Sequence, residues 1–118
     1  MFGVELQVRK CGDNVILALR GELDMVDAAE VTVALVAAAS GRGRTIVDLA
    51  GLTFIDCRGA AALVRAERRV RQAGGSLELA APHTRVRRVF ELSRLIDGVC
   101  FHESLALADA QSASLRCR

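Results

Sequence analysis

A short junction between a strand pattern and a helix pattern is the sequence feature that most constrains the possible fold of this chain. Residues 45–49 are mostly apolar, which is typical of a buried strand. Residues 60–73 place alanine, leucine and valine along one helical stripe and arginines on the opposite face. A strand that leads into a helix presents the unpaired N–H groups of the helix start, which favour an anion or a phosphoryl group. We therefore expect a functional site within residues 48–59.

The length and composition fit one globular domain. A chain of 118 residues can close a single core but leaves no room for a separate second unit. Apolar residues make up 52% of the chain and aromatic residues only 3%, so the core must consist mainly of leucine, valine, isoleucine and alanine. A net charge of +2 is too small to indicate a nucleic-acid surface. We expect a domain over residues 1–110 and a frayed tail over residues 111–118.

The cysteines show no metal-binding pattern. They form no CxxC pair and no His/Cys ligand spacing, so we expect four reduced thiols, no metal and no cofactor. The four residues are Cys11, Cys57, Cys100 and Cys117. Charged residues near the N-terminus argue against a signal peptide. The longest apolar stretch, residues 31–39, is too short to cross a bilayer. These features predict a cytoplasmic protein without direct membrane insertion.

The N-terminal third predicts a hairpin followed by a helix. Residues 4–8 alternate apolar and polar side chains, and residues 15–19 are nearly all apolar, with turn-forming residues between the two segments. Residues 21–24 break the strand pattern. Residues 27–39 alternate in part like a strand, but their length and alanine content favour a helix that ends at the glycine-containing segment 40–43.

The remaining elements continue the alternation of strands and helices. Glycines at 74 and 75 end the second helix, and Pro82 introduces the third. Short strands are expected at residues 76–81 and 99–101, and a last helix at residues 105–110. Right-handed crossovers between parallel strands place their helices on the same side of a sheet. The pattern predicts an α/β fold, a mixed sheet of four or five strands with the helices mainly on one face.

This order of elements resembles the STAS domain of bacterial anti-sigma factor antagonists and sulfate-transporter tails. The resemblance extends over roughly residues 4–110. It is carried by Gly-Glu-Leu-Asp at 21–24, the segment Asp-Leu-Ala-Gly-Leu-Thr-Phe-Ile-Asp at 48–56, the glycine pair at 74–75 and Phe-Glu-Leu-Ser-Arg-Leu at 90–95. The resemblance implies a single STAS-like domain that regulates through protein binding.

The junction departs from the family at one decisive position. In antagonists of this family it typically reads Asp-Ser-Ser-Gly, and a partner kinase, itself the anti-sigma factor, phosphorylates the second serine. Phosphorylation then releases the antagonist, because the added negative charge disrupts the docked surface. This chain reads Asp56-Cys57-Arg58-Gly59. Arg58 stands at the phospho-acceptor position and has no hydroxyl, so the switch that the resemblance implies cannot operate there.

The candidate residues each have a functional and a structural interpretation. Asp24 and Asp56 could contact a partner, or they could cap helices, which is worth ~1 kcal/mol. Cys57 could respond to oxidants, or it could be a small substitute for serine. Arg58 could recognise a carboxylate or phosphate on a partner with its forked guanidinium, or it could be a solvated residue at the helix start. A positive charge is unfavourable at a helix start, which favours the functional interpretation. Together with Gly59, these four residues form the predicted partner-binding site.

Three classes of function follow from this sequence. The leading one is an antagonist-like regulatory module that binds an anti-sigma factor of the histidine-kinase-like ATPase class. An alternative is a STAS accessory subunit of a lipid or anion transporter, or a non-switching paralogue that binds another regulator. The third class, an enzyme, is disfavoured because the sequence has no Ser/His/Asp set, phosphate-binding glycine motif or metal cluster.

Overall fold

The first two strands form the hairpin that the sequence predicts. The computed structural model describes residues 3–11, 14–39 and 43–106. Strand β1 pairs antiparallel with β2 along its whole length. The elements in chain order are β1 (Val4–Cys11), β2 (Asn14–Leu23), α1 (Ala28–Ala38), β3 (Arg44–Ile55), α2 (Cys57–Gln72), β4 (Ser76–Ala80), α3 (Thr84–Leu92), the 3-10 helix η1 (Ile96–Gly98) and β5 (Phe101–His102).

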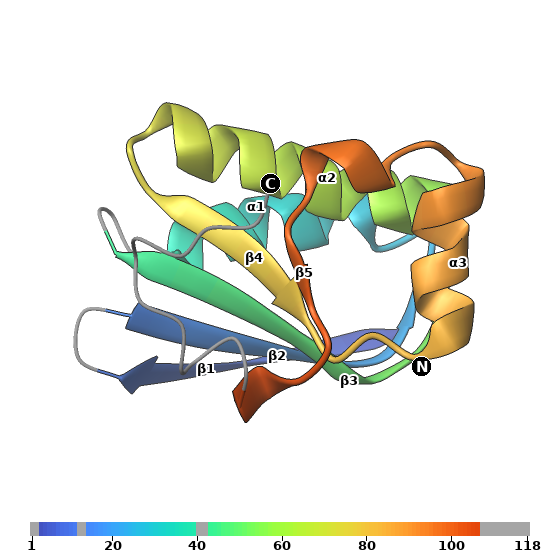
Figure 1. Ribbon diagram of the computed structural model, residues 1–118, viewed down its shortest axis with the longest axis horizontal. Helices are drawn as coiled ribbons and strands as arrows, with labels where there is room; N and C mark the ends of the chain where they lie inside the picture. Colours follow the sequence, from blue (N-terminus) through green and yellow to red (C-terminus); the bar gives the residue numbers. More distant parts are fainter. Residues whose placement is uncertain (1–2, 12–13, 40–42, 107–118) are drawn as a thin grey trace.

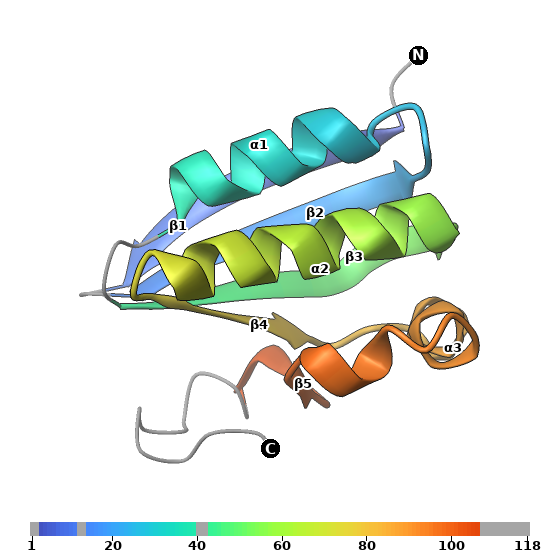
Figure 2. The same ribbon diagram turned by 90° about the horizontal axis from the view of Figure 1, so that it is seen from above.

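The sheet is five-stranded, and its spatial order follows the chain, β1-β2-β3-β4-β5. Strands β2, β3, β4 and β5 run parallel to one another, so three crossovers connect them through α1, α2 and α3. Helices α1 and α2 lie side by side over the same face of the sheet, and α3 lies at one end of the molecule (Figure 1, Figure 2). The predicted mixed sheet with its helices on one face is confirmed.

Strand β3 is longer than the sequence predicts. It continues past residue 49 to Ile55, so the segment before the second helix is strand rather than loop. The sequence also predicted that the second strand ends before residue 21, but β2 continues to Leu23. Two register shifts between β2 and β3 absorb extra residues on β3 and keep the pair together. Consequently β3 passes into α2 with only Asp56 between them.

The core lies between the sheet and the helices. The predicted stripe of α2 is confirmed, because Leu63, Ala66 and Val70 are all buried. Helix α3 joins this core through Phe90, which is fully buried and packs edge-on against Phe101, with ring centroids 5.1 Å apart. None of the described helices is both long and apolar enough to cross a membrane.

Two helices end in left-handed turns. Gly74 has φ of +96°, and the N–H of Gly75 donates to the carbonyl of Val70, which confirms the predicted glycine ending of α2. At the end of α3 the corresponding left-handed residue is Arg94, with φ of 58°. The predicted helix end at residues 40–43, the last helix at 105–110 and the tail at 111–118 lie mostly or wholly outside the described residues.

Candidate functional site

Asp56 links the start of α2 to the loop after β2. Its backbone is extended, and one carboxylate oxygen accepts a 2.7 Å hydrogen bond from the N–H of Gly59. The other oxygen accepts a 3.1 Å bond from the N–H of Met25, thirty-one residues earlier in the chain. Asp56 is therefore the N-cap of α2 and also holds the neighbouring loop in place. The structural interpretation of this residue is correct, and it leaves the carboxylate engaged within the domain.

Asp24 shapes that neighbouring loop. Its carboxylate accepts a 3.0 Å hydrogen bond from the N–H of Val26, and its carbonyl accepts a 3.2 Å bond from the N–H of Asp27. The N–H of Asp56 donates to the carbonyl of Leu23, immediately before Asp24. The ends of β2 and β3 thus bring the two predicted aspartates to the same edge of the sheet. The N-cap of α1 is Asp27, with no side-chain cap bond, so Asp24 does not cap a helix.

Gly59 is required by close packing. A Cβ atom at this position would lie 2.5 Å from the carbonyl oxygen of Leu23 and 2.9 Å from a side-chain carbon of Ile55. The first turn of α2 therefore approaches β2 at a distance that only glycine permits. The residue is buried, so its contribution to the predicted site is to position its neighbours.

Cys57 and Arg58 are the exposed members of the predicted site. The thiol of Cys57 is free, and its sulfur lies 3.2 Å from the hydroxyl oxygen of Ser93, at the end of α3. This contact brings a third chain segment to the junction, which the sequence alone did not indicate. Within the described part of the chain, no carboxylate lies within ion-pair distance of Arg58. Its guanidinium is available to a partner.

Large apolar side chains are exposed around these residues. Met25 and Val26 are 59% and 78% exposed in the loop that Asp56 holds, and Leu92, next to Ser93, is 78% exposed. Sequence analysis missed these residues, although two apolar side chains between acids in a short loop are a detectable signal. We call the combined set of residues the junction surface. It consists of Asp24, Met25, Val26, Asp56, Cys57, Arg58, Gly59, Leu92 and Ser93.

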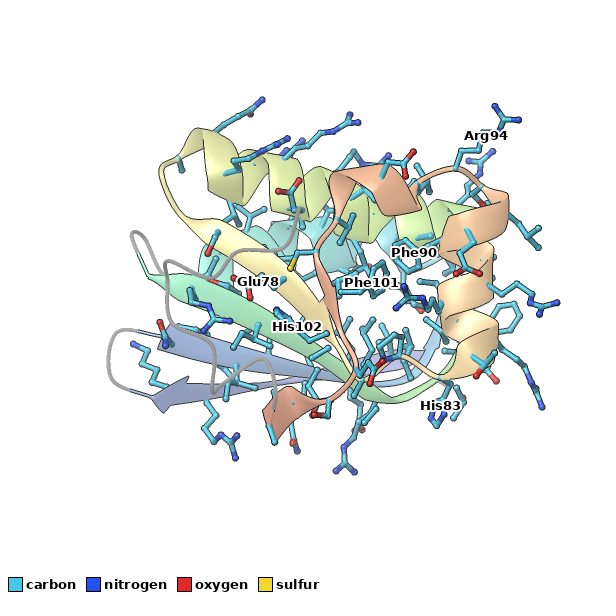
Figure 3. All side chains as sticks on the ribbon, in the orientation of Figure 1. Glu78, His83, Phe90, Arg94, Phe101 and His102 are labelled. Carbon is cyan, nitrogen blue, oxygen red and sulfur yellow. The ribbon has the colours of Figure 1, made fainter. Side chains whose placement is uncertain are left out.

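A second polar cluster is buried at the other end of the strands. Glu78 of β4 accepts hydrogen bonds from Arg44 at 3.1 and 2.6 Å, and it lies 2.8 Å from Nε2 of His102 (Figure 3). Burial raises the pKa of Glu78, but the hydrogen bonds from Arg44 and His102 outweigh this effect and bring the pKa below its ordinary value. The three side chains hold β3, β4 and β5 together.

This cluster includes the one described group of potential metal ligands. Atoms of Glu78, Cys100 and His102 lie within 4.8 Å of one another. Two observations argue against metal binding. Arg44 already occupies both oxygens of Glu78, and Cys100 is disulfide-bonded. The expectation of four reduced thiols is therefore wrong for Cys100, because spacing along the sequence does not reveal which sulfur atoms meet in the fold.

The mixed sheet, the helices on one face and the capped β3–α2 junction define a small α/β domain. The family model described as the Mlab STAS domain matches residues 6–111. The chain belongs to the STAS domain family, which confirms the resemblance seen in the sequence.

Solved structures share this fold. A putative anti-sigma factor antagonist from Thermotoga maritima has a TM-score of 0.76 at 20% identity, over 88% of this chain and 91% of that one. The anti-sigma factor antagonist SpoIIAA in its unphosphorylated form has a TM-score of 0.69 at 22% identity, over 96% and 100%. The structure of SLC26A9 has a TM-score of 0.71 at 14% identity, over 86% of this chain and 21% of that protein.

Proposed function

We propose that this chain is an anti-sigma factor antagonist-like regulatory module, and that it binds an anti-sigma factor of the histidine-kinase-like ATPase class. The observation that carries the proposal is the junction surface. Three segments converge there and expose apolar side chains around the guanidinium of Arg58, for which the described residues supply no ion-pair partner. Binding surfaces typically combine a few apolar or arginine anchors with a polar surround. The module acts by binding alone, with no catalytic role, cofactor or nucleic-acid partner.

Each part of the junction surface has a distinct role in this proposal. Met25, Val26 and Leu92 supply apolar area that a partner covers, while Asp24 and Asp56 hold the loops that present it. Arg58 forms a charge-assisted hydrogen bond with a carboxylate of the partner, because a guanidinium matches carboxylate geometry. Since residue 58 is not a serine, binding is constitutive with respect to phosphorylation there.

Arg58→Glu is expected to weaken partner binding by several kcal/mol, because it reverses a charge inside the interface. Folding should remain nearly intact, since an exposed acid at a helix start is favoured by the helix dipole. Calorimetric titration against the purified partner and thermal melts measure the two effects. Arg65→Glu is the matched control, because it changes another exposed arginine of α2 about two turns away. Equal affinity of wild type and Arg58→Glu would place the interface elsewhere.

The partner kinase with ATP is expected to leave residues 57 and 58 unphosphorylated. Arg58→Ser should become a phospho-acceptor if the junction has kept the family geometry, and mass spectrometry with site mapping measures this. Stoichiometric phosphate on Ser93 of the wild type would show that the switch has moved to the hydroxyl beside Cys57. Failure of Arg58→Ser to accept phosphate would argue against a kinase partner of this class.

The alternative is a STAS accessory subunit of a lipid or anion transporter. One observation favours it, namely the fold shared with a region of the anion transporter Slc26a9. The junction surface would then contact a transporter subunit instead of an anti-sigma factor. Purification of the partner from the native host distinguishes the two, because the first predicts a kinase-like ATPase and the second a transport protein. A different regulator would identify the chain as a non-switching paralogue.

A further inference from the structure

Strand β1 forms one edge of the sheet, and half of its backbone groups face away from the sheet (Figure 1). Among the described residues, β2 is the only strand that pairs with β1. The N–H of Glu22 donates to the carbonyl of Gly3, and these two residues face each other beside the pair Val4–Gly21. Hydrogen-bonded and non-hydrogen-bonded pairs alternate in an antiparallel ladder, so the even-numbered residues of β1 point their N–H and C=O groups outward. An added strand can bind to this row of groups.

The side chains of β1 divide between the two faces of the sheet. Val4 and Leu6 pack against the core beneath the helices, and Val8 shares their face but is 51% exposed. The opposite face carries three exposed polar side chains, those of Glu5, Gln7 and Arg9. Neither Glu5 nor Arg9 forms an ion pair with another described residue. The edge therefore offers one negative and one positive side chain, placed symmetrically about Gln7.

One antiparallel register makes β1 complementary to a second copy of itself. Outward-pointing groups must meet outward-pointing groups, so even-numbered residues pair with even-numbered ones, and the twofold axis passes beside a residue rather than between two. An axis at Gln7 places Glu5 opposite Arg9 of the second copy. It also places Leu6 opposite Val8 of the second copy, whereas an axis at either of these residues places Gln7 opposite one of the two charges. Opposite charges that face each other across two strands stabilise the pairing, so charge selects the axis at Gln7.

A groove next to β1 fits the same register. It has a volume of about 230 Å³ and lies between β1 and α1, which runs above this edge of the sheet (Figure 2). Its lining is apolar at Val4, Leu6, Leu19, Val31 and Ala34 and acidic at Asp27 and Glu30. In this register Val8 of the second copy lies opposite Leu6, and Lys10 of the second copy lies opposite Val4 on the face that carries the two carboxylates. The groove thus receives an apolar side chain and a cation from the same strand.

We propose that the β1 edge binds a second copy of this chain antiparallel, with the twofold axis at Gln7, so that two five-stranded sheets join into one. Glu5 and Arg9 form two symmetric ion pairs on the open face of the joined sheet. On the helical face, Lys10 lies near the carboxylates that border the groove. Each copy uses the same patch, so the interface closes on itself and association stops at the dimer. The interface contains no residue of the junction surface, so the proposal is independent of the proposed function.

The test combines sedimentation equilibrium with amide hydrogen exchange on the full chain. The weight-average mass should rise from 12.6 kDa toward twice that value as the protein concentration increases. The amides of Leu6 and Val8 should exchange more slowly as the dimer forms, because their N–H groups then donate to the second copy. The amide of Gln7 donates to β2, so its exchange should be slow at every concentration.

Two results would overturn the proposal. The first is a chain that stays monomeric at about 1 mM protein, which would leave the edge to a strand of a different protein. The second is a dimer in which Leu6 and Val8 exchange as fast as in the monomer, which would place the contact between the copies on another surface.

Charge variants test the register. Glu5→Arg places like charges opposite each other twice and should weaken dimerisation about tenfold or more. The double variant Glu5→Arg/Arg9→Glu restores opposite charges and should recover the affinity of the wild type. Glu103→Arg is the matched control, because it makes the same charge change at an exposed residue next to β5, at the other edge of the sheet, and it should dimerise like the wild type. Failure of the double variant to recover affinity would contradict the axis at Gln7.

A proline variant tests the backbone pairing separately. Val8→Pro removes an N–H group that points outward, and an edge strand tolerates proline when the missing N–H faces away from the sheet. The variant should stay folded in thermal melts and should lose detectable dimer. Arg58→Glu should dimerise like the wild type, since it changes only the junction surface. Undiminished dimerisation of Val8→Pro would contradict strand pairing, and Glu5→Arg keeps the test valid if Val8→Pro folds poorly.

Discussion

Glu78→Gln is expected to lower the free energy of unfolding by about 3–5 kcal/mol at neutral pH. The substitution keeps the size of the side chain but removes the negative charge that Arg44 contacts through two hydrogen bonds. Arg44 is itself buried, so its guanidinium loses a negatively charged partner away from water. Urea unfolding at neutral pH measures the change. Glu91→Gln is the matched control, because its ion pair with Arg87 at 3.4 Å is exposed and should cost less than about 1 kcal/mol.

The same variant should show a weaker dependence of stability on pH. The hydrogen bonds of Arg44 and His102 hold the folded-state pKa of Glu78 below its ordinary value of 4.5. A depressed folded pKa contributes stability that is present above the unfolded pKa and is lost as the pH falls through the folded pKa. The difference between wild type and Glu78→Gln should therefore shrink as the pH is lowered from neutral to below 4.5. A difference that stays constant over this range would show that the pair contributes through shape rather than charge.

The sequence predicted the helices well because their periodicity is local. Helix α2 shows its buried stripe through residues three and four apart, and this spacing survives in the structure. The end of β3 was mispredicted for an equally specific reason. Leu49, Leu52 and Ile55 are all buried, three residues apart, because each register shift inserts one extra residue between them. A regular spacing of three residues matches neither the two-residue period of a strand nor the 3.6-residue period of a helix, in which spacings of three and four alternate.

The candidate site was predicted in part, and the missing part depends on contacts between distant segments. Asp56 as the N-cap follows from the local order strand, acid, helix. The contact of Cys57 with Ser93 spans thirty-six residues, and the contacts of Glu78 with Arg44 and His102 span thirty-four and twenty-four. Only the fold brings these pairs together, since no local spacing encodes them. The same holds for the apolar side chains that complete the junction surface.

Gly59→Ala is expected to lower the free energy of unfolding by about 3 kcal/mol. The added methyl group would lie 2.5 Å from a backbone oxygen, that of Leu23, so no side-chain rotation relieves the overlap. The first turn of α2 must move away from β2. This movement strains two hydrogen bonds, from the N–H of Asp56 to the Leu23 carbonyl and from the N–H of Met25 to the Asp56 carboxylate. Urea unfolding measures the loss, and amide shifts at Met25 and Val26 report the displaced loop.

Gly98→Ala provides the control for this change, because no heavy atom lies within 4 Å of an added Cβ at that position. Its stability should stay within about 0.5 kcal/mol of the wild type. Gly59→Ala should also weaken partner binding beyond its effect on stability, since the junction surface depends on the position of the loop that carries Met25. Full stability of Gly59→Ala would mean that β2 and α2 can separate freely. Normal binding by a destabilised Gly59→Ala would mean instead that the loop after β2 lies outside the interface, and that Arg58 and the end of α3 alone contact the partner.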